Sequence, residues 1–169
     1  MILPDHAIHQ LCAAGMVEPF DPSLVNPASL DVRLGSQLLI ESCQSPRLVP
    51  YPLEQHSETD PFLLQPSQFV LAATLEFVRV PDTCNAQFVL KSSRAREGIE
   101  HLLAGYLDPG FYGVITLELH NSRQLHAVPI WPGMRIGQLV FSQMLAPPER
   151  SYAVTGRYQG DTTVMESRG

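Results

Sequence analysis

Short hydrophobic runs broken by turn residues make up most of the chain. Apolar positions alternate with polar ones or form short blocks, and 15 prolines and 11 glycines separate the blocks. Because side chains alternate between the two faces of a strand, this period predicts strands rather than long helices. The pattern is typical of a mainly β fold with many turns. The predicted strands span residues 30–34, 36–43, 69–73, 75–80, 86–90, 102–104, 114–120, 128–131 and 136–141.

Two short segments have a helical pattern instead. Ile8, Leu11 and Cys12 form an apolar stripe before Gly15, which predicts an N-terminal helix. Residues 92–97 predict a second helix, which ends where a glycine follows. We therefore expect one or two short helices beside the strands.

Two polar stretches lie outside these elements. Residues 44–61 are rich in proline, serine and glutamate and predict an exposed loop or a hairpin arm. The segment beyond Pro147 and Pro148 is polar and turn-rich, so residues 148–169 form either a disordered tail or a lid that closes over a ligand. We expect residues 1–169 to form a single domain that ends in this flexible segment.

The predicted strand 114–120 places one carboxylate among apolar residues. Its apolar face has Ile115, Leu117 and Leu119, so Glu118 lies on the opposite face. A carboxylate with apolar neighbours is costly to bury without a partner or a chemical task. An exposed strand with its polar face in water would also explain a lone glutamate. The neighbouring cations described next, together with Asp108, favour a polar pocket.

The run KSSRAR at residues 91–96 is the densest cluster of cations in the chain. Lysine and arginine donate hydrogen bonds to oxyanions, and arginine can do so with two parallel bonds. The amides at the start of the predicted helix add further donors for a phosphate. Together with Glu118, this run predicts a phosphate-binding corner beside a general acid or base.

Composition narrows the class of protein. The chain has 169 residues, enough for one domain, with 44% hydrophobic and 17% charged residues. A net charge of −6 argues against a general nucleic-acid or membrane-surface binder, which would need a basic face. Three scattered cysteines fit neither a disulfide framework nor a zinc site and indicate a reducing compartment. We expect a cytoplasmic protein with no membrane partner.

Several motifs in order give the chain a resemblance to the dCTP deaminase family, within the trimeric dCTP deaminase and dUTPase superfamily. The resemblance implies a distorted, jelly-roll-like β-barrel of the dUTPase type, assembled as a homotrimer with sites between subunits. The segments that resemble the family are residues 1–3, 18–22, 26–35, 69–72, 92–118, 132–139 and 157–160.

The resemblance also implies roles for individual residues. Glu118 is the general acid and base that activates the water attacking C4 of cytosine, and Arg96 lies against it. Ser92 and the Ala104 carbonyl hold that water. The implied contacts to the triphosphate are Lys91, Ser93 and Arg157, and Asp108 contacts the 3′-hydroxyl. Thr116 contacts the base edge, and Tyr152 lies near the nucleotide. Further implied nucleotide-binding residues are Arg94, Ala95, Leu117 and Gln159.

The implied reaction is zinc-independent deamination of dCTP to dUTP and ammonia. Zinc deaminases combine H-x-E with P-C-x-x-C, whereas His56 and Glu58 have no accompanying cysteine pair. The family binds the nucleotide as its magnesium triphosphate, which requires no metal held by the protein. It also implies dTTP as a feedback inhibitor that competes for the same site.

Some positions depart from the family pattern, and alternatives stay open. Lys91 stands where arginine is usual, Arg94 stands where an aliphatic residue is usual, and Asp161 stands where a nucleotide-contacting glutamine is expected. Residues 104–108 resemble the dUTPase version of this turn, which suggests a bifunctional enzyme giving dUMP and pyrophosphate. The altered tail leaves a third alternative, a non-catalytic nucleotide-binding regulator on the same fold.

Overall fold

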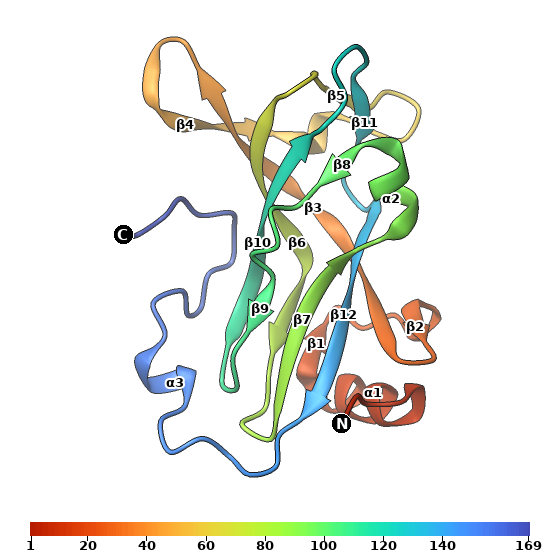
Figure 1. Ribbon diagram of the computed structural model, residues 1–169, viewed down its shortest axis with the longest axis vertical. Coiled ribbons are helices and arrows are strands. Elements are labelled where there is room, and N and C mark those ends of the chain that lie inside the picture. The colour runs from red at the N-terminus through yellow and green to blue at the C-terminus, as the bar shows by residue number, and fades with distance from the viewer.

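A single curled antiparallel sheet dominates the computed structural model, which describes residues 1–169 (Figure 1). The strand order is β8-β10-β6-β3-β12-β7-β9, with β1 paired to β6 and both β2 and β4 paired to β3. A second, two-stranded sheet is formed by β5 and β11. The predicted mainly β class is confirmed, and the sheet curls into a half-barrel around the core.

The elements follow one another along the chain with short connections. The strands are β1 Val17–Glu18, β2 Val25–Asn26, β3 Ser29–Ser42, β4 Ser45–Pro52, β5 Phe62–Leu64, β6 Phe69–Arg79, β7 Cys84–Leu90, β8 Ile99–Glu100, β9 Tyr106–Leu107, β10 Tyr112–Asn121, β11 Val128–Ile130 and β12 Arg135–Gln143. The helices are α1 Asp5–Leu11, α2 Ser92–Glu97 and α3 Tyr152–Thr155, with shorter turns at Cys12–Met16, Pro22–Leu24 and Leu53–Gln55. No helix is long and apolar enough to cross a membrane.

The inward faces of the long strands build the core. Burial alternates along most of β10 and β12, as the period-two pattern requires, whereas residues 29–32 of β3 and 70–74 of β6 are buried on both faces. On β10, Leu117 and Leu119 are buried in this core, while Thr116 and Glu118 lie on the other face and are only partly buried. The predicted division of this strand into an apolar and a polar face is therefore confirmed.

Both predicted helices are present: α1 continues into the turn Cys12–Met16, which contains Gly15, and α2 ends at Gly98. Gly15 has a φ of 96° and Gly98 a φ of 103°, which lie in the left-handed region that favours glycine. Residues 44–61 include β4, which pairs with β3, so the expected hairpin arm is confirmed.

Three strand predictions needed correction. The predicted breaks at residues 35 and 74 are absent, because β3 and β6 continue through irregular pairing at these positions. The predicted strand 102–104 is wrong, since Leu102 and Leu103 have φ values of 28° and 58° and form an exposed turn. Strand β5 was missed because three residues are too few to show a period.

A buried ion pair crosses the sheet between β3 and β6. The Arg33 Nε atom lies 2.7 Å from Oε1 of Glu76, and the Arg33 backbone N–H donates to Oε2 at 2.8 Å. Only 1% of the Glu76 side chain is exposed. Burial raises the pKa of Glu76, and the hydrogen bonds from Arg33 oppose that rise. Removing one partner therefore leaves an uncompensated group inside the sheet.

Replacing Glu76 with glutamine should lower the free energy of unfolding by about 3 kcal/mol, because it breaks a buried pair. Urea denaturation at equal protein concentration measures this loss. The matched control is Glu18→Gln, which breaks an exposed pair with Arg79 at 2.9 Å. That control should cost less than about 1 kcal/mol. Equal losses in the two variants would contradict a structural role for the buried pair.

Candidate functional site

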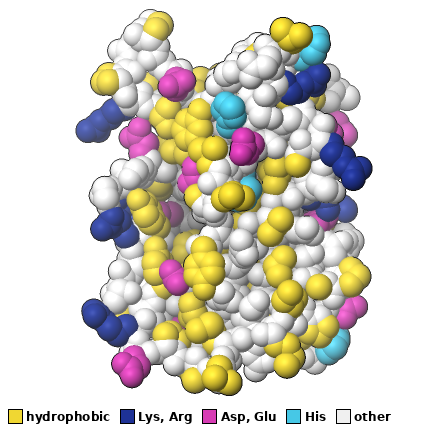
Figure 2. All heavy atoms as spheres, viewed as in Figure 1, with side chains coloured by type: hydrophobic (Ala, Val, Ile, Leu, Met, Phe, Trp, Pro, Cys, Tyr) yellow, Lys and Arg dark blue, Asp and Glu magenta, His cyan; other side chains and the backbone are white.

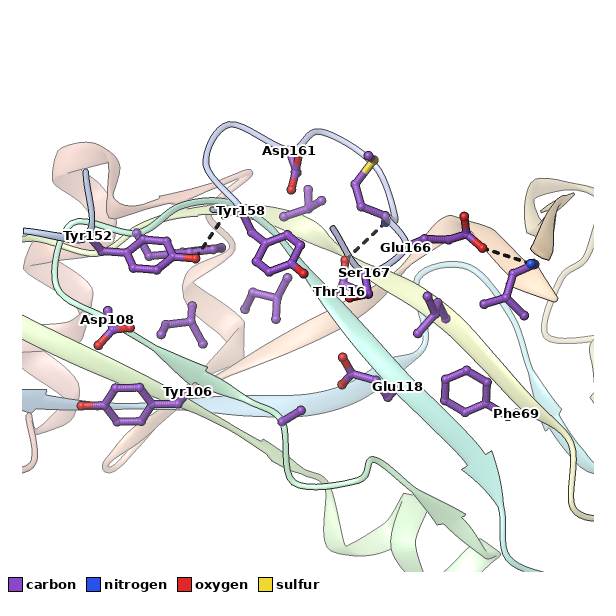
Figure 3. Close-up of a pocket in the computed structure, with 18 residues that line it drawn as sticks. Phe69, Tyr106, Asp108, Thr116, Glu118, Tyr152, Tyr158, Asp161, Glu166 and Ser167 are labelled. Atoms are coloured by element: carbon purple, nitrogen blue, oxygen red, sulfur yellow. Dashed lines mark hydrogen bonds between the residues drawn. The ribbon is translucent and has the colours of Figure 1, made fainter. Parts of the chain in front are cut away.

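A cavity of about 680 Å³ opens between the polar face of β10 and the C-terminal tail (Figure 3). Strands β4, β6 and β10, the segment 104–111 and the tail all contribute to its wall. A cavity of this size, mainly apolar with a few polar groups, suits a small-molecule ligand. Its lining residues are Leu48, Phe69, Leu71, Ala104, Tyr106, Leu107, Asp108, Phe111, Val114, Ile115, Thr116, Glu118, Tyr152, Tyr158, Asp161, Met165, Glu166 and Ser167.

Glu118 lies in this cavity with apolar neighbours. Its partner across the ladder is Leu71 of β6, and both side chains line the cavity. The Oε2 atom of Glu118 is buried and has no hydrogen-bond partner. Burial raises the pKa of this carboxyl above its ordinary value. A carboxyl with a raised pKa accepts a proton more readily than an ordinary glutamate and can give it back, as a general acid and base must do.

The C-terminal tail forms one wall of the cavity. The Met165 backbone N–H donates to Oγ1 of Thr116 at 3.4 Å, and the Leu48 N–H donates to Oε1 of Glu166 at 3.0 Å. Val164 is buried against Val114 and its neighbours on β6. These contacts fold residues 164–166 over the polar face of β10, as the close-up shows.

The start of the tail is fixed to the segment before β10. The amide of Gln159 donates to the carbonyls of Gly110 and Tyr152, and its Oε1 accepts from the Tyr112 N–H at 2.8 Å. Gln159 therefore acts here as a tether between tail and sheet. Its side chain does not line the cavity.

Asp161 pairs with a basic residue of the tail itself. Its carboxylate contacts the guanidinium of Arg168, which also donates to the carbonyl of Arg157 at 2.7 Å. The Arg168 guanidinium stacks over the Tyr158 ring, 5.4 Å from the centroid. These contacts hold the end of the tail, at Arg168, against residues 157–161, two of which line the cavity.

The cavity wall is acidic. Among the lining residues Asp108, Glu118, Asp161 and Glu166 are carboxylates, and none is lysine, arginine or histidine. In the space-filling view, basic side chains lie mainly along the edges of this face, whereas hydrophobic side chains and several acidic ones lie in its middle (Figure 2). A polyanion bound here would need cations that this wall does not supply.

The cationic run 91–96 lies elsewhere. Lys91 contacts buried Asp31 at 2.6 Å, and Arg94 contacts Glu97 at 2.8 Å within α2. Ser92, Ser93, Ala95 and Arg96 of α2 are exposed. In Figure 1, α2 and the C-terminal tail lie on opposite sides of the molecule. The chain alone therefore does not form the expected corner of cations beside Glu118.

The structure thus divides the sequence-predicted site residues into two groups. The cavity brings together Ala104, Asp108, Thr116, Glu118 and Tyr152. The residues that do not line it are Lys91, Ser92, Ser93, Arg94, Ala95, Arg96, Leu117, Arg157 and Gln159.

Two of these placements differ from the expected contacts. Leu117 has only 1% of its surface exposed and faces the core, so only its backbone can meet a ligand in the cavity. Arg96 was expected to lie against Glu118 but makes no ion pair with it within the chain, and Oε2 of Glu118 has no hydrogen-bond partner.

Sequence reasoning missed several cavity residues. Phe69 and Leu71 share a face of β6, and their period-two spacing on a strand beside β10 could have indicated them. Tyr158, Met165 and Glu166 lie in an irregular tail, where no periodicity indicates which side chains face a ligand.

Comparisons of the sequence with a family model and with known proteins agree on one family. A family model described as dCTP deaminase-like matches residues 2–144. The chain is 40% identical to "dCTP deaminase, dUMP-forming" of Acidothermus cellulolyticus over 99% of this chain and 95% of that protein. It is 39% identical to the protein of the same name from Mycolicibacterium smegmatis, over 99% and 96%.

A solved structure supports the fold. The 2′-deoxycytidine 5′-triphosphate deaminase of Agrobacterium tumefaciens superposes with a TM-score of 0.68 at 24% identity. The match covers 85% of this chain and 48% of that one. The fold, the family match over most of the length and the two relatives agree with the resemblance in the sequence. The chain belongs to the dCTP deaminase-like family.

Proposed function

We propose that this protein deaminates dCTP and then hydrolyses the triphosphate, releasing ammonia, pyrophosphate and dUMP. The observation that carries the first step is the buried, unpartnered Oε2 of Glu118 in a nucleotide-sized cavity. The second step is supported by relatives of about 40% identity that are named dUMP-forming. The sequence alone favoured dUTP as the final product, and these relatives favour the bifunctional alternative.

In the proposed deamination, Glu118 moves protons in two directions. It removes a proton from water, the resulting hydroxide attacks C4 of cytosine, and the carboxyl delivers that proton to N3. It then moves the proton of the new hydroxyl to the amino nitrogen. The C4–N bond breaks, ammonia leaves, and C4 becomes a carbonyl. The pKa of Glu118, raised by burial, suits a group that must be base and acid in turn.

The triphosphate step needs charge neutralisation that one chain does not provide. We propose a homotrimer in which α2 of one subunit, with Ser92, Ser93 and Arg96, completes the cavity of another. The support is the combination of four carboxylates and no cation in the cavity wall with exposed residues of α2. Arg96 of a neighbouring subunit then approaches Glu118, and Lys91 and Arg94 add positive charge nearby.

Magnesium enters this proposal with the nucleotide. No group of three or more His, Cys, Asp or Glu side chains is placed to hold a metal ion. In this proposal the ion would bind phosphate oxygens of the nucleotide and would neutralise their negative charge. In the hydrolytic step, water attacks the α-phosphorus and the bond to the oxygen bridging to the β-phosphate breaks. Asp108 binds the 3′-hydroxyl and holds the sugar in place.

Residues 148–169 act as the lid of the site in this proposal. Tyr152, Tyr158 and Met165 from this segment line the cavity, and Gln159 ties its base to the sheet. Arg157 extends from the lid toward the triphosphate. dTTP, which has the same sugar and triphosphate, competes for this cavity. We also propose a cytoplasmic location, which the three unpaired cysteines and the nucleotide substrate support.

Glu118→Gln should reduce ammonia release from dCTP by about 10²–10⁴-fold, because the amide cannot transfer the protons. Pyrophosphate release from dUTP should continue, since that step does not use this carboxyl. Parallel ammonia and pyrophosphate assays measure both. The control is His120→Gln on the same strand face, outside the cavity lining, which should leave both rates unchanged.

Three outcomes would separate the alternatives. Ammonia without pyrophosphate from dCTP in the native protein would show that dUTP is the final product. Nucleotide binding without any turnover would favour the non-catalytic regulator. Undiminished ammonia release by Glu118→Gln would remove Glu118 from the chemistry.

The pH profile provides a further test of the Glu118 role. A general base works only when ionised, so a pKa raised by burial predicts that kcat/KM for deamination falls as pH drops through that raised value. The acidic limb should therefore lie at higher pH than an ordinary glutamate would give. A limb at or below the ordinary value would contradict the assignment.

Mixing two inactive variants tests the site between subunits. Glu118→Gln and Arg96→Ala should each be nearly inactive alone, whereas exchanged trimers should recover roughly a quarter of the native rate, since about one site in four joins two intact halves. Differently tagged subunits establish that exchange has taken place. Proven exchange with no recovery would mean that Arg96 does not act across an interface.

A further inference from the structure

Strands β6 and β10 lose their regular pairing beside the cavity. Val114 pairs with Phe77 and Thr116 pairs with Ala73, so residues 74–76 stand opposite Ile115 alone. Such a bulge leaves backbone groups without their usual ladder partners and redirects the strand. The residues that follow it on β10 include Thr116 and Glu118, which line the cavity.

A side chain replaces the missing ladder bond. The backbone N–H of Ile115 donates to Oγ1 of Thr74 at 2.9 Å, and that hydroxyl donates in turn to the Glu76 carbonyl at 2.8 Å. Both contacts are buried, and Thr74 is only 2% exposed. The hydroxyl thus accepts from one strand and donates to its own, which valine could not do.

The opposite edge of β6 fixes Thr74 from the other side. Leu34 of β3 pairs with Thr74. Next to it, a Cβ atom on Gly35 would lie 3.0 Å from the Ala73 carbonyl oxygen and 3.3 Å from that of Thr74. The absence of a side chain at Gly35 therefore lets β3 approach closely at the level of the bulge. Thr74 is held between two strands and has little freedom to move.

We propose that Thr74 is a positioning residue for the deamination step. The inference rests on the proposed function of Glu118. The Thr74 hydroxyl accepts the Ile115 N–H and so fixes the position of the β10 backbone after the bulge. That position determines where Thr116 and the Glu118 carboxylate lie relative to the cytosine base. Without the hydroxyl, a buried N–H loses its acceptor and the strand shifts to satisfy it. A displacement of about 1 Å at the reacting groups is enough to cost on the order of 10²-fold in rate.

The test compares Thr74→Val, which keeps the shape and loses the hydroxyl, with Thr74→Ser, which keeps the hydroxyl. We expect valine to lower kcat for ammonia release by about 10–100-fold, with a change in KM below about threefold. Serine should retain at least about a third of the native kcat. The control is Ser29→Ala, which removes another buried hydroxyl, one that donates to Gln138 at 2.8 Å.

A merely structural role would give a different result. In that case Thr74→Val would lower the melting temperature while kcat per folded molecule stayed within about twofold of the Ser29→Ala control. Equal loss of kcat in the valine and serine variants would also overturn the proposal.

Amide exchange separates this inference from the proposed function. Faster exchange at Ile115 in Thr74→Val, with protection kept in Thr74→Ser, is expected whether or not the substrate is dCTP. Unchanged protection in the valine variant would refute the positioning contact. Absence of ammonia release by the native protein, with Ile115 behaving as expected, would instead refute the proposed function, and with it the role in deamination, while the contact between Thr74 and Ile115 would stand.

Discussion

The burial of one carboxylate without a partner is the constraint on which the site depends. An ionised group in apolar surroundings is destabilising, and the fold keeps Glu118 there although its Oε2 has no hydrogen bond. The same strand buries Leu117 and Leu119 in the core, so Glu118 cannot turn away without disrupting that packing. The same burial that destabilises the ionised carboxylate raises its pKa, which favours proton transfer.

The rest of the molecule fits around this carboxylate in two parts. The curled sheet and the tail give a mainly apolar, acidic cavity, which suits a base and a sugar. The cations needed for a triphosphate lie on α2, outside that cavity. The proposed site shared between subunits would reconcile the two, because one chain would provide the acid and another would provide the charge. The arrangement would also make the activity depend on assembly.

The sequence predicted features that follow from local patterns. The alternation around Leu117 predicted strand β10 and its two faces. Gly98 predicted the end of α2, because a helix often ends at a residue with positive φ, which glycine adopts readily. The supposed strand at 102–104 failed because three apolar residues also fit a turn. A short apolar run contains too little periodicity to decide between the two.

Long-range pairing could not be predicted in this way. Lys91 was assigned to phosphate, but it lies 2.6 Å from Asp31, sixty positions earlier in the chain. The contacts of Asp161 and Glu166 depend on how an irregular tail folds back, and nothing in their neighbours encodes that path. The acid itself was identifiable because an apolar strand with a lone glutamate is unusual, whereas the groups around it come from distant segments.

The most direct test of the account is a titration of the Glu118 carboxyl carbon, observed by ¹³C NMR in the native protein with glutamate labelling and assigned by comparison with Glu118→Gln. The account predicts a titration midpoint above the ordinary value of a glutamate side chain, because burial raises its pKa. A midpoint at or below that ordinary value would show that solvent or the charge of a neighbouring Arg96 outweighs burial, and would contradict the central claim.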